Sequence, residues 1–252
     1  MLVPNKNIAT SLNLLDHMTP FMSEFIGTAV LITLGDGVVA NVVLTKTKGY
    51  NSGLMAITFG WMIAVFAGVL IAAKDSGAHL NPAVTLALAS LHKISWDVVP
   101  VYLAAQLLGA MAGALLVWMS YKQHFDETAD ATTQLAVFCT APSIRNAGHN
   151  FITELIGTFI FMLAVLYIIP PSSSLGALDA LPVSFIVLGI GLSLGGPTGY
   201  AINPARDLGP RIMHAILPLK NKRDSDWKYS WIPVVAPVIG ALIAAYVYAA
   251  IH

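Results

Sequence analysis

The sequence predicts an all-α membrane protein with six transmembrane helices and two re-entrant half-helices in two inverted repeats. Three observations predict this fold. Of the 252 residues, 56% are hydrophobic and only 10% are charged, whereas a soluble domain usually has about 25% charged residues. Apolar runs of about 20 residues recur along the chain, and each is long enough to cross a bilayer as a helix. Two shorter apolar segments, one in each half, contain the tripeptide Asn-Pro-Ala.

The transmembrane helices are expected where the long apolar runs lie. We predict full spans at 21–45, 53–73, 98–120, 149–169, 181–196 and 230–251.

Two further apolar segments are too short to cross a membrane. Segment 77–91 lies between the second and third spans, and segment 199–217 lies between the fifth and sixth. Such segments are candidates for re-entrant half-helices, because non-helical backbone is tolerated in a bilayer only where protein or a water-filled cavity satisfies it. We expect each half-helix to begin at its Asn-Pro-Ala.

The two halves of the chain resemble each other. The stretches MSEFIGTAVLI and ITELIGTFIFM share the pattern Ser/Thr-Glu-x-Ile-Gly-Thr. A similar number of residues separates Glu24 from Glu154 and Asn81 from Asn203. This spacing indicates that one unit of three spans and a half-helix is duplicated.

The duplication predicts the domain organisation. We expect one transmembrane channel domain over 1–252, with a first repeat at 21–125 and a second at 147–252. An odd number of spans in each repeat inverts the second copy. Inverted repeats commonly build a path at their interface, near the middle of the membrane.

The orientation in the membrane is ambiguous from charge. With the N-terminus inside the cell, most of the lysines and arginines fall on the outer side, many of them in segment 206–228. The positive-inside rule therefore favours the opposite orientation. Segment 206–228 is also a candidate lid.

The pair Asn-Pro is physically suited to the start of a helix. Proline fits the first helical position, where its missing N–H is no loss, and asparagine caps the helix. We expect each Asn side chain to keep an amide free for the lumen. The predicted pore centre is formed by Asn81, Pro82, Ala83, Asn203, Pro204 and Ala205.

The residues before each tripeptide are expected to run extended and to present carbonyl groups. The predicted pore carbonyls belong to Gly77, Ala78, His79, Gly199 and Ala201. If the half-helices meet at their N-termini, their positive ends converge. This opposes cations, and it orients water so that proton conduction fails.

Together, SGAHLNPAVT and GYAINPARDLGPR closely resemble the major intrinsic protein family, which contains the aquaporins and the glycerol facilitators. The resemblance covers the chain from Glu24 to the last span, and it is to the aquaglyceroporin and bacterial glycerol facilitator branch. It implies an aquaporin-like fold, a homotetramer with one pore per subunit, and both termini inside. We accept this topology over the count of basic residues, much of which lies in 206–228.

The resemblance also implies a selectivity filter. Trp61 stands where glycerol facilitators have Trp, Gly191 where water-selective members have His, and Tyr200 where facilitators often have Phe. Gly191 is expected to widen the ring, while the aromatic residues face the carbon backbone of a solute and Arg206 binds its hydroxyls. Tyr in place of Phe leaves the solute open, and Trp61 has a second interpretation as a lipid-facing aromatic. The predicted ring is Trp61, Gly191, Tyr200 and Arg206.

Several charged residues are expected to support the pore. In the family, Asp207 and a basic partner mark glycerol-conducting members, and Arg211 lies one helical turn further on, within pairing distance. Acids within a membrane are functional candidates by default. Because Glu24 and Glu154 are duplicated, we expect them to brace the carbonyls from behind, with a proton relay as the alternative.

Two further polar residues are Asp36 and His79. Asp36 lies in the first span, and it is expected either near the end of that span in solvent or in a pore vestibule, where it would bias the pore against anions. His79 is expected to be a core histidine bonded to backbone rather than a direct contact of the solute.

The leading function is a passive channel for small uncharged solutes, chiefly glycerol and water. Alternatives are a channel mainly for neutral lactic acid, dihydroxyacetone, urea or hydrogen peroxide, or a water-selective pore. A coupled secondary transporter is a different class that also uses inverted repeats, although the acids within the membrane are few.

Other classes lack support in the sequence. It has no metal-ligand cluster, nucleophile elbow or nucleotide loop, so we expect no enzyme, cofactor or metal. Thirteen basic residues balance thirteen acidic ones, which does not favour nucleic acid. The expected location is the lipid bilayer of a bacterial plasma membrane, as a multi-pass protein.

Overall fold

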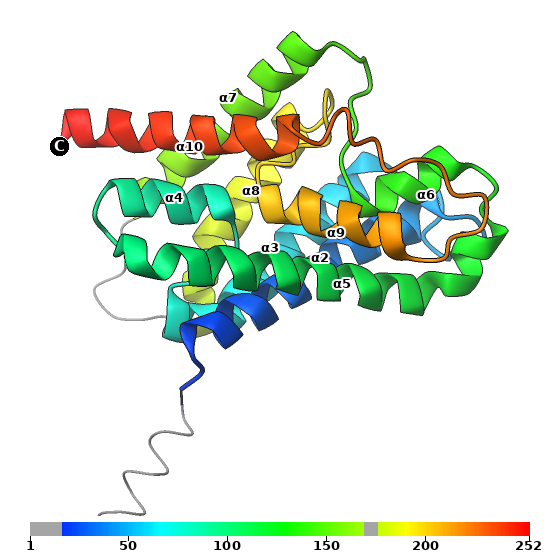
Figure 1. The fold of residues 1–252 in the computed structure, drawn as a ribbon, viewed down its shortest axis with the longest axis horizontal. Coiled ribbons are helices and arrows are strands. Elements are labelled where there is room, and N and C mark those ends of the chain that lie inside the picture. The colour runs from blue at the N-terminus through cyan, green and yellow to red at the C-terminus, as the bar shows by residue number, and fades with distance from the viewer. Residues whose placement is uncertain (1–16, 169–175) are drawn as a thin grey trace, which may run out of the picture.

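The computed structural model describes residues 17–168 and 176–252, and this part of the chain is helical with connecting turns and loops (Figure 1). The first residues of the predicted domain, and residue 169 of the predicted fourth span, lie outside the described residues.

Within the described residues, six helices are long and apolar enough to cross a membrane. Their order and number agree with the predicted spans, and their ends differ by a few residues. The third span extends past residue 120 into a polar stretch that ends at Glu127. The backbone N–H of the C-cap residue Thr128 donates to the carbonyls of His124 and Phe125. The helices are α2 (Pro20–Val43), α3 (Gly53–Ser76), α5 (Val99–Glu127), α7 (Ala147–Leu166), α8 (Leu181–Leu194) and α10 (Ile232–Ile251).

Two of the spans are preceded by short 3₁₀ turns. The turn η1 (Trp96–Val98) leads into α5, and the turn η2 (Gly176–Ala180) leads into α8. A further short helix, α6 (Ala131–Phe138), was not expected from the sequence. Asp130 marks the start of this helix, because its side chain accepts hydrogen bonds from the backbone N–H groups of Thr132 and Thr133, as an N-cap residue does.

Two half-helices lie between the spans. Helix α4 (Pro82–Ser90) and helix α9 (Pro204–Ile216) each begin at the proline of an Asn-Pro-Ala, as expected. In Figure 1 they lie end to end, with their N-termini facing each other. The positive ends of both helices therefore point at the middle of the molecule.

The backbone before each half-helix follows the same irregular path. Positive φ occurs at Gly77, Ala78 and Leu80, and at the matching residues Gly199, Tyr200 and Ile202. Positive φ is uncommon outside glycine. The same unusual geometry in both halves supports our proposal that 21–125 and 147–252 are two copies of one unit.

Small residues let the helices pack closely around these segments. A Cβ atom at Gly109 of α5 would lie 2.4 Å from the carbonyl oxygen of Phe25 in α2. In the other half, a Cβ atom at Gly240 of α10 would lie 2.4 Å from the carbonyl oxygen of Leu155 in α7. Glycine at such positions allows the backbones of membrane helices to approach.

Candidate pore

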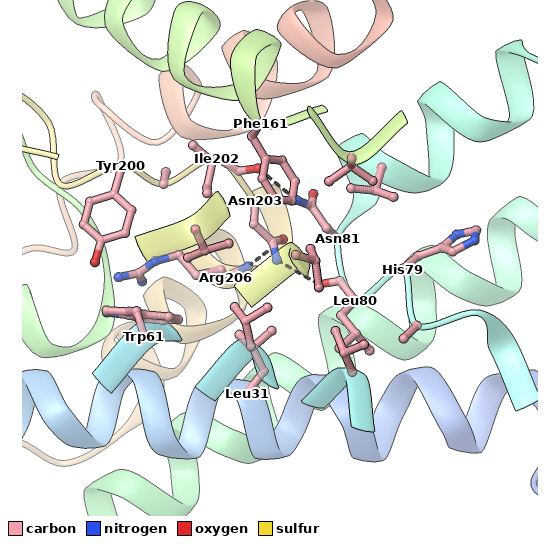
Figure 2. Close-up of a pocket in the computed structure, with 18 residues that line it drawn as sticks. Leu31, Trp61, His79, Leu80, Asn81, Phe161, Tyr200, Ile202, Asn203 and Arg206 are labelled. Atoms are coloured by element: carbon pink, nitrogen blue, oxygen red, sulfur yellow. Dashed lines mark hydrogen bonds between the residues drawn. The ribbon is translucent and has the colours of Figure 1, made fainter. Parts of the chain in front are cut away.

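The two half-helices are joined where their N-termini meet. The side-chain amide of Asn81 donates to the carbonyl of Ile202 at 2.9 Å, and the amide of Asn203 donates to the carbonyl of Leu80 at 2.8 Å (Figure 2). The side-chain oxygen of each Asn caps its own helix. The amides are therefore less free than expected, because one N–H of each is bonded to a carbonyl ahead of the other half-helix and only the second is left for a solute.

Glu24 holds the first irregular segment from behind. Its side chain is fully buried, and it accepts hydrogen bonds from the backbone N–H groups of His79 at 2.9 Å and Leu80 at 2.7 Å. The hydroxyl of Ser76 and the amide of Gln106 also donate to it. A buried carboxylate is tolerated when its oxygens are paired in this way.

Glu154 holds the second segment in the same manner. It accepts from the backbone N–H groups of Ala201 at 3.0 Å and Ile202 at 3.1 Å. Both glutamates therefore bind the peptide N–H groups ahead of an Asn-Pro-Ala. Their oxygens are engaged in holding the backbone, which supports the structural role over a proton relay.

A cavity of about 90 Å³ lies against the two irregular segments. It has room for several water molecules, since one needs about 10–15 Å³ on this measure. Asn81 and Asn203 line it, and so do residues 78–80 and 200–202. The rest of its wall is mostly apolar, formed by Leu31, Trp61, Val65, Val69, Val84, Phe161, Val165, Val183 and Val187.

The predicted pore residues do not all reach this cavity. Ala78, His79 and Ala201 line it, whereas Gly77 and Gly199 do not. Each of these glycines has a φ near +80°, a left-handed backbone conformation that glycine adopts without steric cost. Leu80 and Ile202 line the cavity instead; their carbonyls are the acceptors of the two Asn amides. The remaining tripeptide residues, Pro82, Ala83, Pro204 and Ala205, start the half-helices behind the Asn side chains.

Three of the four predicted filter residues gather at one end of the cavity. The guanidinium carbon of Arg206 lies 4.2 Å from the centroid of the Trp61 ring, and Tyr200 stands beside them (Figure 2). Trp61 is only 4% exposed, so it does not face lipid. Its ring lies on Gly35 of α2, where a Cβ atom would come within 2.3 Å of it.

Gly191 has a different place from the one expected. It lies behind Tyr200, and it is not among the residues that line the cavity. A Cβ atom at Gly191 would lie 2.4 Å from the methyl group of Thr58 and 3.0 Å from the Tyr200 ring. The missing side chain therefore makes room for Tyr200 and Thr58 and leaves no open space, because the helices pack closely here.

Asp207 and Arg211 form a buried ion pair. The Nε of Arg211 donates to Asp207 Oδ1 at 2.8 Å, and the backbone N–H and the hydroxyl of Thr140 donate to Asp207 Oδ2. Both charged side chains are fully buried. The pair expected from the sequence is present, and it fixes α9 to the chain after α6.

The candidate lid is tied down in this structure. Arg211 donates to the carbonyls of Ser225 and Asp226, and the ring of His214 bonds the Ser225 hydroxyl. Arg145 pairs with Asp226, and this hydrogen-bonded partner raises the pKa of Arg145. Because a buried guanidinium needs hydrogen-bond acceptors, the side chain of Arg211 holds the backbone of Ser225 and Asp226 in place.

The surroundings of Asp36 and His79 differ from those expected. Asp36 lies neither in solvent nor in a vestibule: it is fully buried, and its Oδ1 is 3.6 Å from Nη1 of Arg206. The ring of His79 bonds the hydroxyl of Thr85 rather than backbone, and it packs on Tyr102. The partner of Asp36 lies in the other half of the chain, which the local sequence does not reveal, whereas the partner of His79 lies only six residues further on.

The fold and the site together define a class of protein. Six apolar helices pack with two half-helices that meet end to end, and the cavity at their junction is lined mostly by apolar side chains, with the Asn amides and a guanidinium among them. This is a multi-pass membrane protein of the channel class. The sequence model of the major intrinsic protein family matches residues 11–248, and the chain belongs to that family.

Similar proteins cover nearly the whole chain. A Thermotoga maritima protein named "Probable glycerol uptake facilitator protein" is 54% identical over 92% of this chain and 98% of its own. The "D/L-lactic acid transporter" of Lactiplantibacillus plantarum is 43% identical over 89% and 94%. The X-ray structure of the aquaglyceroporin from Plasmodium falciparum has a TM-score of 0.80 and 36% identity, and the match covers 90% of this chain and 93% of that one.

Proposed function

We propose that this protein is a passive channel for small uncharged solutes, chiefly glycerol, and that water follows the same path. The observation that carries the proposal is the lining of the cavity, which combines a mostly apolar wall with the asparagine amides and Arg206. Its apolar wall suits the carbon backbone of a polyol, and the asparagine amides and Arg206 suit its hydroxyls. The names of the Thermotoga and Plasmodium proteins support the same solute class.

Within this proposal, each part of the site has a role. Trp61, Tyr200 and Arg206 form the constriction, and Gly191 shapes it by seating Tyr200. Asn81 and Asn203 bind the solute at the centre. Glu24, Glu154 and Asp207 act as structural supports. We place the protein in a bacterial plasma membrane, in line with the bacterial relatives, with both termini inside and as a homotetramer with one pore per subunit.

Stopped-flow light scattering on proteoliposomes tests the proposal. After an inward glycerol gradient, vesicles with the protein should shrink and re-swell quickly, while vesicles in an impermeant sugar should shrink and stay small. Collapse of all ion gradients should leave the glycerol rate unchanged, because a passive channel needs no coupling ion. Glycerol entry no faster than in empty liposomes would reject the proposal, and loss of entry without ion gradients would favour a coupled transporter.

Neutral lactic acid is a second candidate solute, which the Lactiplantibacillus relative favours by its name. Lactic acid has three carbons, with a carboxyl and a hydroxyl group toward one end and a methyl group at the other, so it suits a wall with both apolar and polar groups. Its entry should increase as the external pH falls, because the neutral form becomes more abundant. Comparison of lactic acid and glycerol rates in the same vesicles ranks the two solutes.

A further inference from the structure

Asp36 is a buried acid that the proposed transport path does not yet use. It lies on α2, directly after Gly35, against which the Trp61 ring packs. Its side chain is fully buried, and neither carboxylate oxygen has a hydrogen-bond partner among the described residues. The charge that faces it belongs to Arg206, whose Nη1 lies 3.6 Å away and is likewise buried without a hydrogen-bond partner.

The other buried acids of the described chain are engaged elsewhere. Asp207 follows Arg206 directly, but its oxygens accept from Arg211 and Thr140. Glu24 and Glu154 accept from the backbone ahead of the half-helices, and Asp226 pairs with Arg145. Asp36 is therefore the carboxylate in the described part of the chain that is available to balance Arg206.

The carboxylates of Glu24 and Glu154 lie behind the pore centre, bound to the backbone, so among the described acids only Asp36 is placed to offset the charge of Arg206. The N-termini of α4 and α9 each contribute a partial positive charge, and Arg206 adds a full one. Such an arrangement excludes cations, but by itself it favours the entry of anions. A buried charge is also costly to leave unpaired, which applies to Asp36 and Arg206 alike.

We propose that Asp36 is the counter-ion of Arg206, a positioning residue that holds the guanidinium against Trp61 and cancels its charge, so that the constriction admits uncharged solutes and rejects anions. This inference rests on the proposed function as a channel for neutral solutes. The pairing joins α2 to the start of α9, so it also fixes the wall of the constriction opposite Tyr200.

The first test is the chloride permeability of the Asp36→Asn variant, which removes the charge and keeps the size. Proteoliposomes would hold a halide-sensitive dye, with potassium and valinomycin present to clamp the membrane potential. We expect the ratio of chloride to glycerol permeability to rise on the order of tenfold over the wild type, equivalent to about 1.4 kcal/mol. In an Arg206→Gln background, the same Asp36 substitution should not raise the ratio, because the charge to be balanced is gone.

Thr28→Val is the matched control. Thr28 lies on the same helix, is fully buried, and has a hydroxyl without a hydrogen-bond partner among the described residues. This variant should keep the wild-type ratio. An unchanged ratio in Asp36→Asn, or an equal rise in Thr28→Val, would overturn the proposal. Glycerol flux of the wild type is measured in the same vesicles, so failure of the proposed function is seen separately.

A second measurement covers the case in which Asp36→Asn does not fold. Thermal unfolding in detergent would compare Arg206→Gln with the double variant Asp36→Asn/Arg206→Gln. If the two residues pair, the single variant strands a buried carboxylate, and the double variant should melt several degrees higher. A double variant that melts at the same temperature as the single one, or below it, would overturn the pairing.

Discussion

The guanidinium of Arg206 lies over the indole ring of Trp61, with its carbon atom 4.2 Å from the ring centroid. A cation over an aromatic face at this distance is attracted by the ring. The contact brings together residues from α3 and α9, which lie in different halves of the chain. It holds the positive charge of Arg206 against the face of the Trp61 ring.

Replacement of Arg206 by alanine should loosen size selectivity. The substitution removes the side chain that lies over Trp61, so a four-carbon polyol such as erythritol should gain access relative to glycerol. Since one methylene in a pocket is worth on the order of tenfold or more in discrimination, we expect the erythritol-to-glycerol ratio to rise by about that factor. Light scattering with both polyols measures it, and an unchanged ratio would argue against this ring.

Gly191→His should reduce glycerol flux more than water flux. A side chain at this position collides with Thr58 and Tyr200, so Tyr200 is pushed toward the lumen and the larger solute is hindered first. Gly189→His is the matched control on the same helix, because a Cβ atom there meets nothing within 4 Å. Equal loss of both fluxes in Gly191→His would indicate misfolding instead of a narrower ring.

Glu154→Gln should destabilise the second irregular segment. The amide oxygen can still accept one hydrogen bond, but the NH₂ group faces the N–H that now loses its acceptor. An unsatisfied buried group costs about 1–3 kcal/mol, so thermal unfolding in detergent should occur at a lower temperature, and both solute fluxes should fall. If the residue were instead a proton relay, the melting temperature would be unchanged and a proton leak would be altered.

Cys139 should resist thiol reagents in the folded protein. It is the one cysteine of the sequence, its side chain is buried, and burial raises the pKa of its thiol, so little reactive thiolate forms. Maleimide labelling at neutral pH should be slow in mild detergent and fast after denaturation. Rapid labelling of the folded protein would show that the chain after α6 opens.

The sequence by itself determined the spans and the starts of the two half-helices. Apolar length is enough to find a membrane helix, and an Asn-Pro pair marks where a half-helix starts. The duplicated Glu24 and Glu154 could also be assigned to the backbone ahead of each half-helix. In the structure, each one accepts hydrogen bonds from that backbone.

Only the tertiary structure decided which residues meet across the two halves of the chain. The amide of Asn81 donates to Ile202, Asp36 faces Arg206, and the methyl group of Thr58 fills the space at Gly191. Each relationship joins segments that are far apart in the chain. Local composition fixes whether a segment is helical and apolar, but the neighbours of a side chain depend on how the helices pack, which no single stretch of sequence contains.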